Sequence, residues 1–295
     1  MYKEILGLLV CPVCKGKFSL EEREMEAKEV VEGSLICEKG HRYTIRKGVI
    51  DFGSQEQEGF NQWSEFLEEN NFEELDREVE QQKSAKEREQ QEKHIKSIVD
   101  DAMQLEKGCI VDIASGRGML LTQLAKVVKE EVNLIATDLS FDILMYDRMK
   151  IKKLNPNARV NYIACDATAM PLEEGCADMT VSLCGIENMV GIVEAGVKEA
   201  ARVTNKNGKL LNAYIVVKED SEGFRVMKKL CEENGMVGAE RACLDKEMQE
   251  LHSKYFSEVV THVIVEDIYG AEENKLDLLP YKGEWFSYVT YEGRK

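Results

Sequence analysis

The sequence predicts an α/β fold in which helices cover both faces of a mostly parallel sheet, with a small cysteine-rich unit in front of it. From residue 108 onward, short apolar runs alternate with segments of helical spacing, and this alternation is typical of a parallel sheet. A glycine turn follows the first of these runs, and four metal-ligand residues stand in two pairs before residue 50. We therefore expect a metal-binding unit at 1–50, an acidic helical connector at 51–107 and an α/β domain at 108–295.

The composition indicates a globular protein with a sizeable core, because 43% of its 295 residues are hydrophobic. The sequence has no apolar run as long as the roughly 18 residues of a membrane-spanning helix. Its first residues also lack the small-residue cleavage site of a signal peptide. We therefore expect a cytoplasmic location, where the nine cysteines are metal ligands or buried thiols and not disulfides.

The chain is strongly acidic. Its net charge is −16, and residues 51–107 alone hold 17 acidic against 7 basic residues. Proteins that bind nucleic acids usually present a basic face, because much of their affinity comes from neutralising phosphates. The charge therefore counts against an RNA or DNA partner.

The first 50 residues contain the two halves of a zinc site. Cys11 and Cys14 are separated by two residues, and Cys37 and His41 form a second pair after a spacer. Three thiolates and one imidazole make a closed tetrahedral site of the structural kind. Short predicted strands surround the pairs, and so small a unit needs a metal because it cannot build an adequate core. The alternative is four reduced side chains without a metal.

The connector is expected to be largely helical. Phe60, Trp63, Phe66 and Leu67 follow the spacing of one amphipathic helix. A second helix runs to about Gln104, just before the first strand of the α/β domain. For Phe60 and Trp63 we favour plain packing against the sheet, and covering a bound ligand is the alternative.

A turn of small residues follows the first strand of the α/β domain. The apolar run before it ends in Asp112, and Ala114, Gly116 and Gly118 lead into a segment of helical spacing. Glycines allow a tight bend and let a ligand approach the backbone, and the free N–H groups of the helix start face that ligand. A second apolar run ends in Asp138, where a carboxylate can accept hydrogen bonds from ribose hydroxyls. These residues predict a nucleotide site.

The turn, D-x-A-x-G-x-G, resembles motif I of the class I S-adenosylmethionine-dependent methyltransferases, whose fold is a Rossmann-like seven-stranded sheet. The resemblance covers residues 108–217 closely and includes E-x-x-R-V at 199–203 and an acid with a small residue, Asp166 and Ala167, after the third strand. It covers the C-terminal part loosely, where two last apolar runs would form the antiparallel pair that closes this family's sheet. The sequence departs from the family at Ala114, where most members have glycine.

The resemblance implies S-adenosylmethionine as the cofactor and assigns its ligands. The first acid and the turn hold the methionine part, the second acid holds the ribose, and the third acid accepts from the adenine amino group. Leu139 packs on the adenine, although core packing explains it equally well. The residues implied in cofactor binding are Asp112, Ala114, Gly116, Gly118, Asp138, Leu139, Asp166 and Ala167.

The metal-binding unit is similar to two kinds of zinc ribbon. Residues 8–16, 36–43 and 48–52 resemble the ribbons of methyltransferase activator subunits and the ribbon that precedes the catalytic domain of bacterial ribosomal RNA guanine-N1 methyltransferases. In the latter enzymes the ribbon is implicated in gripping RNA. A structural zinc below a solvated face is the alternative. The basic residues that would grip RNA here are Lys15, Lys17, Lys39, Arg42, Arg46 and Lys47.

These features together predict the transfer of a methyl group from S-adenosylmethionine to an acceptor that the sequence does not identify. We favour a small molecule or a protein over RNA because of the net charge. A ribosomal RNA base methyltransferase is one alternative, and a non-catalytic cofactor-binding or partner-binding protein is the other. Because methyl transfer needs mainly the alignment of donor and acceptor, no catalytic residue is assigned.

The loop at 184–189 is where acceptors approach in the resembling family. Glu187 and Asn188 in this loop orient an acceptor or cap the next helix, and we favour capping. His94 and His252 lie in charged segments of helical spacing. We therefore expect both histidines at the surface and assign them no role.

Overall fold

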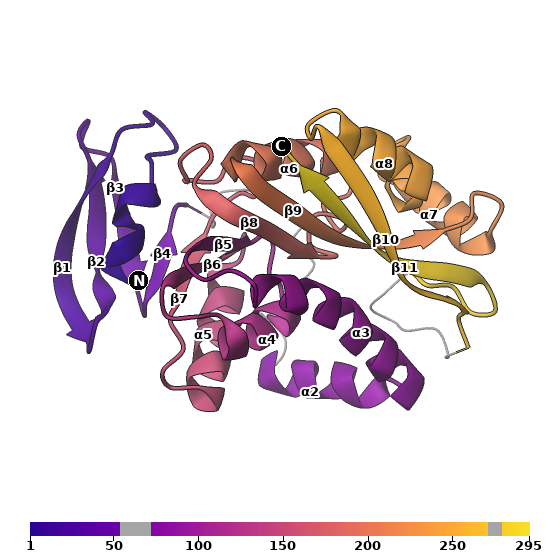
Figure 1. Ribbon diagram of the computed structural model, residues 1–295, viewed down its shortest axis with the longest axis horizontal. Coiled ribbons are helices and arrows are strands. Elements are labelled where there is room, and N and C mark those ends of the chain that lie inside the picture. The colour runs from indigo at the N-terminus through magenta and orange to yellow at the C-terminus, as the bar shows by residue number, and fades with distance from the viewer. Residues whose placement is uncertain (54–71, 271–278) are drawn as a thin grey trace.

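The computed structural model describes residues 1–53, 72–270 and 279–295 (Figure 1). The first expected connector helix, with Phe60, Trp63, Phe66 and Leu67, lies outside the described residues. The strands are β1 (Phe18–Glu26), β2 (Glu29–Cys37), β3 (Arg42–Arg46), β4 (Val49–Asp51), β5 (Gly108–Asp112), β6 (Val132–Asp138), β7 (Val160–Ala164), β8 (Ala177–Leu183), β9 (Thr204–Val217), β10 (Glu258–Ile268) and β11 (Trp285–Arg294). The helices are α2 (Phe72–Gln82), α3 (Ala85–Ala102), α4 (Met119–Val127), α5 (Phe141–Leu154), α6 (Val193–Val203), α7 (Glu222–Glu233) and α8 (Asp245–Ser253), with short 3-10 helices η1 (Lys3–Leu8) and η2 (Ala239–Cys243).

All these strands belong to one sheet, in the order β1-β2-β3-β4-β7-β6-β5-β8-β9-β11-β10. Strands β7, β6, β5, β8 and β9 are parallel, and β11 runs antiparallel between β9 and β10. This confirms the expected Rossmann-like seven-stranded sheet with its closing antiparallel pair. Because the carboxyl ends of parallel strands meet at one edge of a sheet, the loops after β5, β6, β7 and β8 gather there.

The zinc-ribbon unit extends the same sheet. Strand β4 pairs in parallel with β7, so that Val49 lies opposite Tyr162 and Asp51 opposite Ala164. Val49 and Ile50 are fully buried, and this burial is what makes so short a strand favourable at the join. The expected boundary between 1–50 and 51–107 thus falls within β4, a strand that serves both the ribbon and the α/β sheet.

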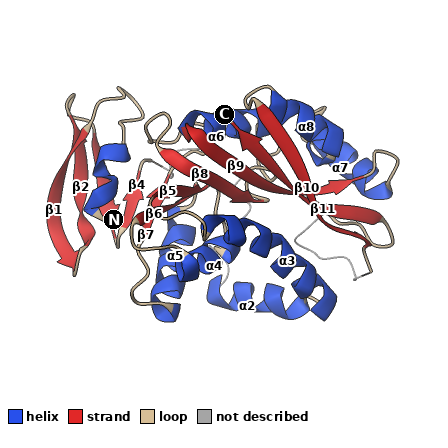
Figure 2. Ribbon diagram, in the orientation of Figure 1, coloured by secondary structure: helices blue, strands red, loops and turns tan. Residues whose placement is uncertain are grey.

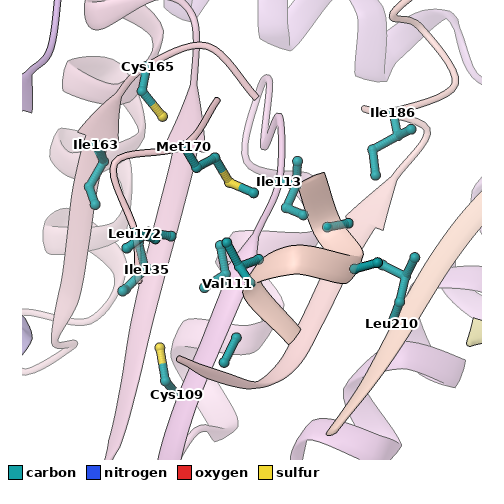
Figure 3. Packing of buried hydrophobic residues seen from close by; sticks show 14 of the residues in the cluster. Cys109, Val111, Ile113, Ile135, Ile163, Cys165, Met170, Leu172, Ile186 and Leu210 are labelled. Carbon is teal, nitrogen blue, oxygen red and sulfur yellow. The ribbon is translucent and has the colours of Figure 1, made fainter. Parts of the chain in front are cut away.

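Helices cover both faces of the sheet (Figure 2). Helices α3, α4 and α5 pack on one face, and α6, α8 and the inner side of the ribbon form the apolar cluster on the other. Figure 3 shows the second cluster, where Val111, Ile135 and Ile163 from three adjacent strands lie close to Met170 and Leu172. These last two residues follow Asp166, so the loop after β7 is part of the core and not a loose connection.

The expectation that both histidines lie at the surface is wrong. His94 on α3 is 2% exposed and donates its Nε2–H to the carbonyl of Val289, and His252 on α8 is fully buried. Burial lowers the pKa of each imidazole to about 4. Each histidine lies on the buried face of its helix, since Ile98 follows His94 and His252 follows Met248 by one turn.

None of the described helices has the length and apolar character needed to cross a membrane.

Candidate functional site

The turn after β5 is built on left-handed backbone. The φ angles of Ala114, Gly116 and Gly118 are 53°, 54° and 65°. A side chain at Gly118 would place its Cβ 2.5 Å from an oxygen of Asp147, so this position excludes larger residues. Ala114 adopts its φ at a cost of about 1–2 kcal/mol, because it is not glycine. Its Cβ fits only because residue 185, in the loop after β8, is a glycine that lies against it.

The first two acids lie side by side at the ends of β5 and β6. Asp112 and Asp138 are 1% and 7% exposed. Asp138 accepts hydrogen bonds of 2.9 Å from the N–H groups of Gly116 and Ser140. Burial raises the pKa of both carboxyls, and the charge of Asp138 raises that of Asp112 further. Asp112 Oδ2 has no donor within the described part of the chain, so it can accept from a cationic group of a ligand.

The third acid lies at the end of the next strand. Asp166 accepts hydrogen bonds of 2.7 Å from both the N–H and the hydroxyl of Thr168, which fixes its side chain. The N–H of Cys165 donates to the carbonyl of Asp138, so the loops after β6 and β7 are held together. Leu139 and Ala167 are partly exposed in these two loops. Apolar and acidic groups therefore alternate along this part of the edge.

The loop after β8 closes the other side of the turn. Ser182 Oγ donates to the carbonyl of Ile113 and accepts from the N–H of Ile186. The carboxylate of Glu187 accepts from the N–H of Ile215, with both oxygens 3.1 Å away. The capping role favoured for Glu187 is therefore wrong. Helix α6 begins only at Val193, and no side chain caps it.

Four charged residues around the turn were missed by the sequence analysis. Asp147 on α5 is fully buried, and neither of its oxygens has a hydrogen-bond donor among the described residues. The nearest cation is the Nζ of Lys150, 3.7 Å away. Arg117, inside the turn itself, is 8% exposed and forms an ion pair with Asp76 on α2. Charged residues of α2 and α5 therefore surround the turn, in addition to the acids at the ends of β5 and β6.

The four expected metal ligands come together. The Sγ atoms of Cys11, Cys14 and Cys37 and a ring nitrogen of His41 all lie within 4.8 Å of one another. The distance from Cys37 Sγ to His41 Nδ1 is 3.2 Å, and that from Cys14 Sγ to Cys37 Sγ is 3.6 Å. In tetrahedral zinc sites, bond lengths of about 2.0–2.3 Å separate ligand atoms by roughly 3.5–3.8 Å. The arrangement therefore has the chemistry and the size of a zinc site.

The surroundings of Cys11 favour its thiolate. Burial acts to raise the pKa of Cys11, but N–H groups of Cys14 and Val13 and the hydroxyl of Tyr43 lower it to about 6. The Tyr43 hydroxyl lies 3.6 Å from Cys11 Sγ. A hydrogen bond of this kind orients a metal ligand.

Three of the six basic residues that would grip RNA are paired with acids. Arg42 contacts Glu21, Arg46 contacts Asp51, and Lys17 contacts Glu173. These pairs reduce the positive charge that the ribbon would offer to a phosphate backbone.

The family comparison agrees with this geometry. A model described as "Methyltransferase domain" matches residues 104–281, which is more than half of the chain. The chain belongs to the methyltransferase domain family. A second model, described as "Trm112p-like protein", matches residues 3–48. The two matches lie on the α/β sheet and on the ribbon, respectively.

Curated relatives match part of the α/β domain. The ubiquinone/menaquinone biosynthesis C-methyltransferase UbiE of Xylella fastidiosa is 26% identical over 129 residues, which are 41% of this chain and 51% of the relative. UbiE of Rickettsia prowazekii is 31% identical over 105 residues, 35% of this chain and 42% of the relative. The chain thus spans about half the length of the curated relatives that it matches.

Solved structures share the fold at low sequence identity. A Bacillus halodurans protein superposes with a TM-score of 0.51 at 17% identity, over 68% of this chain and 98% of that one. Phosphoethanolamine N-methyltransferase 2 of Haemonchus contortus has a TM-score of 0.50 at 16% identity, over 68% and 52% of the two chains. Both likenesses support the fold described above.

Proposed function

We propose that the protein transfers a methyl group from S-adenosylmethionine to a small-molecule acceptor. The observation that carries this proposal is the row of three acids, Asp112, Asp138 and Asp166, at the carboxyl ends of β5, β6 and β7 around the left-handed turn. A scaffold protein has no need of two almost fully buried carboxylates beside a glycine turn, because burial of such groups is unfavourable without a partner.

Each residue has a role that its surroundings support. Asp112, with an oxygen that lacks a donor, accepts from the ammonium group of the cofactor's methionine part. Asp138 accepts from the ribose hydroxyls through the lone pairs that its backbone partners leave open. Asp166 accepts from the adenine amino group, and Leu139 and Ala167 contact the adenine ring. Ala114, Gly116 and Gly118 provide the close backbone approach.

The chemistry itself asks little of the side chains. The cofactor, when bound, supplies a sulfonium methyl group that an acceptor attacks in line. The protein's contribution is to hold donor and acceptor in that alignment and to exclude water. Gly185 and Glu187 lie in the loop that faces the methyl position in this family, and the bond from Ile215 holds the Glu187 carboxylate in place for orienting an acceptor.

We further propose one structural zinc ion per chain, bound by Cys11, Cys14, Cys37 and His41. All four positions of a tetrahedral site are filled by protein ligands, so this zinc has no open position for catalysis. Its role is to hold the ribbon together, since the ribbon is too small to fold on its own core.

A small-molecule acceptor is supported over RNA by two observations. The chain carries a net charge of −16, and three of the six ribbon residues that would grip RNA are paired with acids. The matched relatives are named for C-methyltransferase reactions of ubiquinone and menaquinone biosynthesis, and those acceptors are small molecules. An RNA acceptor would instead require salt-sensitive binding of RNA fragments at low ionic strength.

Calorimetry with S-adenosylmethionine and S-adenosylhomocysteine tests the cofactor site. Replacing Asp138 with alanine should weaken binding by about 1.5–3 kcal/mol, because it removes hydrogen bonds to a charged group. Asp142→Ala is the matched control, since it removes an exposed acid from the start of the neighbouring helix α5. Unchanged affinity in the Asp138 variant would mean that the ribose lies elsewhere. Equal losses in both variants would indicate an unspecific effect of charge.

Transfer of radiolabelled methyl groups tests the acceptor. Small phenolic, quinol and amine compounds are offered in one series, and ribosomal RNA fragments in another. We expect label only in the first series. Label in RNA, together with binding that disappears when Lys39 and Lys47 are changed to glutamate, would assign the acceptor to RNA instead.

A further inference from the structure

Helix α2 is fastened to the glycine turn mainly through one carboxylate, that of Asp76, and Glu80 Oε1 on the same helix lies farther from Arg117 Nη1, at 3.6 Å. Asp76 Oδ1 accepts from Nη1 of Arg117 at 2.5 Å, and Oδ2 accepts from the hydroxyl of Tyr146 at 2.9 Å and from Nζ of Lys150 at 3.3 Å. The side chains of Asp76 and Arg117 are only 15% and 7% exposed. Three donors from two other elements therefore converge on a single acid that comes from the connector.

The same group of charges reaches the backbone of the turn. Lys150 Nζ donates to the carbonyl oxygen of Arg117, the residue between Gly116 and Gly118. Arg117 is therefore held twice, by its guanidinium through Asp76 and by its carbonyl through Lys150. Glycines on either side give the turn conformational freedom, and fixing the residue between them removes much of that freedom.

The remaining described contacts of α2 are few. Val79 is its buried apolar side chain among those that the structure describes, and the acids Glu73, Glu74 and Glu78 are exposed. Burial alone would raise the pKa of Asp76, but the charges of Lys150 and Arg117 and the hydrogen bonds of Tyr146 and Arg117 hold it below its usual value. The acid is therefore ionised at neutral pH and retains its attraction for both cations.

We propose that Asp76 is a positioning residue for the cofactor: from α2 it holds Arg117, and thereby keeps the glycine turn in the shape that binds the cofactor. This inference rests on the proposed function, because it takes the turn to be the cofactor site. Linkage makes the effect reciprocal, so that bound cofactor must also fasten α2 to the turn.

Calorimetry with S-adenosylhomocysteine on the full chain tests the proposal. Asp76→Asn removes the charge at nearly constant shape and should weaken binding roughly 10-fold, within the usual range of 5–150-fold for coupled sites. Glu78→Gln is the matched control, because it makes the same change at an exposed position of the same helix, and it should bind as the unchanged protein does. Arg117→Lys keeps the charge but not the fork of donors, and an intermediate loss is expected.

Hydrogen exchange supplies a readout that a purely structural role would not move. In the unchanged protein, S-adenosylhomocysteine should slow exchange in α2 as well as in the turn. In Asp76→Asn it should still slow exchange in the turn but no longer in α2. Combining Asp76→Asn with Arg117→Gln should weaken binding no more than Arg117→Gln alone, since both changes remove the same contact.

The possible failures are distinguishable. If the unchanged protein does not bind S-adenosylhomocysteine, the proposed function and this inference fall together. If it binds, but Asp76→Asn and Glu78→Gln bind equally well, only the positioning role is overturned. Should Asp76→Asn fail to fold, the Arg117→Lys variant decides, and full affinity in that variant would contradict the proposal.

Discussion

The ribbon and helix α2 each hold one loop at the carboxyl edge of the parallel strands, and the contact at β4 of the ribbon differs in kind from the contact of α2. At β4 the ribbon is joined by backbone pairing and apolar packing, because β4 pairs with β7 and Val49 and Ile50 are fully buried. Elsewhere the ribbon also forms ion pairs, chiefly those of Glu29 with Arg148 and Lys152 on α5. Helix α2 is joined mainly by ion pairs of Asp76 with Arg117 and Lys150. The strand pairing at β4 is expected to resist salt and acid, and the ion pairs of α2 to depend on charge.

The ribbon's contacts bracket the loop that carries Asp166. On one side the N–H of Phe52 donates to the carbonyl of Ala164, the last residue of β7. On the other side the N–H of Val10, the residue before the first metal ligand, donates to the carbonyl of Pro171. Both ends of the loop with Asp166 are therefore fixed by the ribbon, whereas α2 fixes the glycine turn.

The largest expected effect comes from breaking the ribbon. Cys14→Ser removes one zinc ligand, and zinc binding to such units is worth on the order of 10 kcal/mol of folding free energy. We expect loss of zinc, measured by elemental analysis, together with faster hydrogen exchange in residues 164–171. Binding of S-adenosylhomocysteine should weaken as well, because the loop with Asp166 loses its anchor.

A matched control distinguishes the effect of losing a metal ligand from the effect of losing any thiol. Cys176→Ser changes a partly buried cysteine outside the zinc cluster and should leave the zinc content at one per chain. Full zinc content in Cys14→Ser would contradict the four-ligand site. Zinc loss with unchanged exchange in residues 164–171 would show that the strand pairing alone fixes the loop.

The comparison also shows which parts of the site could be predicted from the sequence. Asp112, Asp138 and Asp166 each follow directly or closely after an apolar run, so the end of each strand marks them. The residues proposed as zinc ligands are marked by their spacing. The contact between Asp76 and Arg117 has no such signal, because the two residues are 41 positions apart and neither belongs to a repeating pattern.

Two features carried a signal that was missed. Asp147 lies on the apolar stripe of α5 with Ile143 and Ile151, four residues away on either side, and an acid on such a stripe indicates burial. The high charge of its helix predicts a surface position for His94, although Ile98 and Val99 mark a buried face beside it. The join between β4 and β7 could not be foreseen, because a three-residue strand is too short to show a period.

The two described helices of the connector, α2 and α3, are expected to respond differently to acid. In α3 the pKa of His94 is lowered to about 4 by burial, whereas an unfolded histidine titrates near 6.5. Below pH 6.5 the unfolded state takes up a proton that the folded state does not, so stability falls with pH until about pH 4. One such histidine accounts for a loss of about 2 kcal/mol between pH 7 and pH 5.

The His94→Gln variant measures this loss. Glutamine can still donate to the carbonyl of Val289 but does not titrate, while His252 contributes equally to both proteins. In denaturant titrations, the decrease in unfolding free energy from pH 7 to pH 5 should be about 2 kcal/mol smaller in the variant. The same decrease in both proteins would mean that His94 is protonated in the folded state.

The pKa of Asp76 lies below its usual value, so the attachment of α2 should persist through this pH range and be lost only in stronger acid.

The smallest expected effect is the response of α2 to salt. At 1 M salt the screening length falls to about 3 Å, from about 10 Å at 0.1 M. Because Asp76 and Arg117 are largely buried, screening reaches them only in part, and we expect a loss of about 1 kcal/mol or less in S-adenosylhomocysteine binding. Asp76→Asn should show a smaller salt dependence than the unchanged protein, since it no longer has the charge. Hydrogen exchange should rise in α2 but not in β4, which is held by backbone pairing. Equal salt responses in β4 and α2 would mean that both elements are attached in the same way, and the contrast between them would not hold.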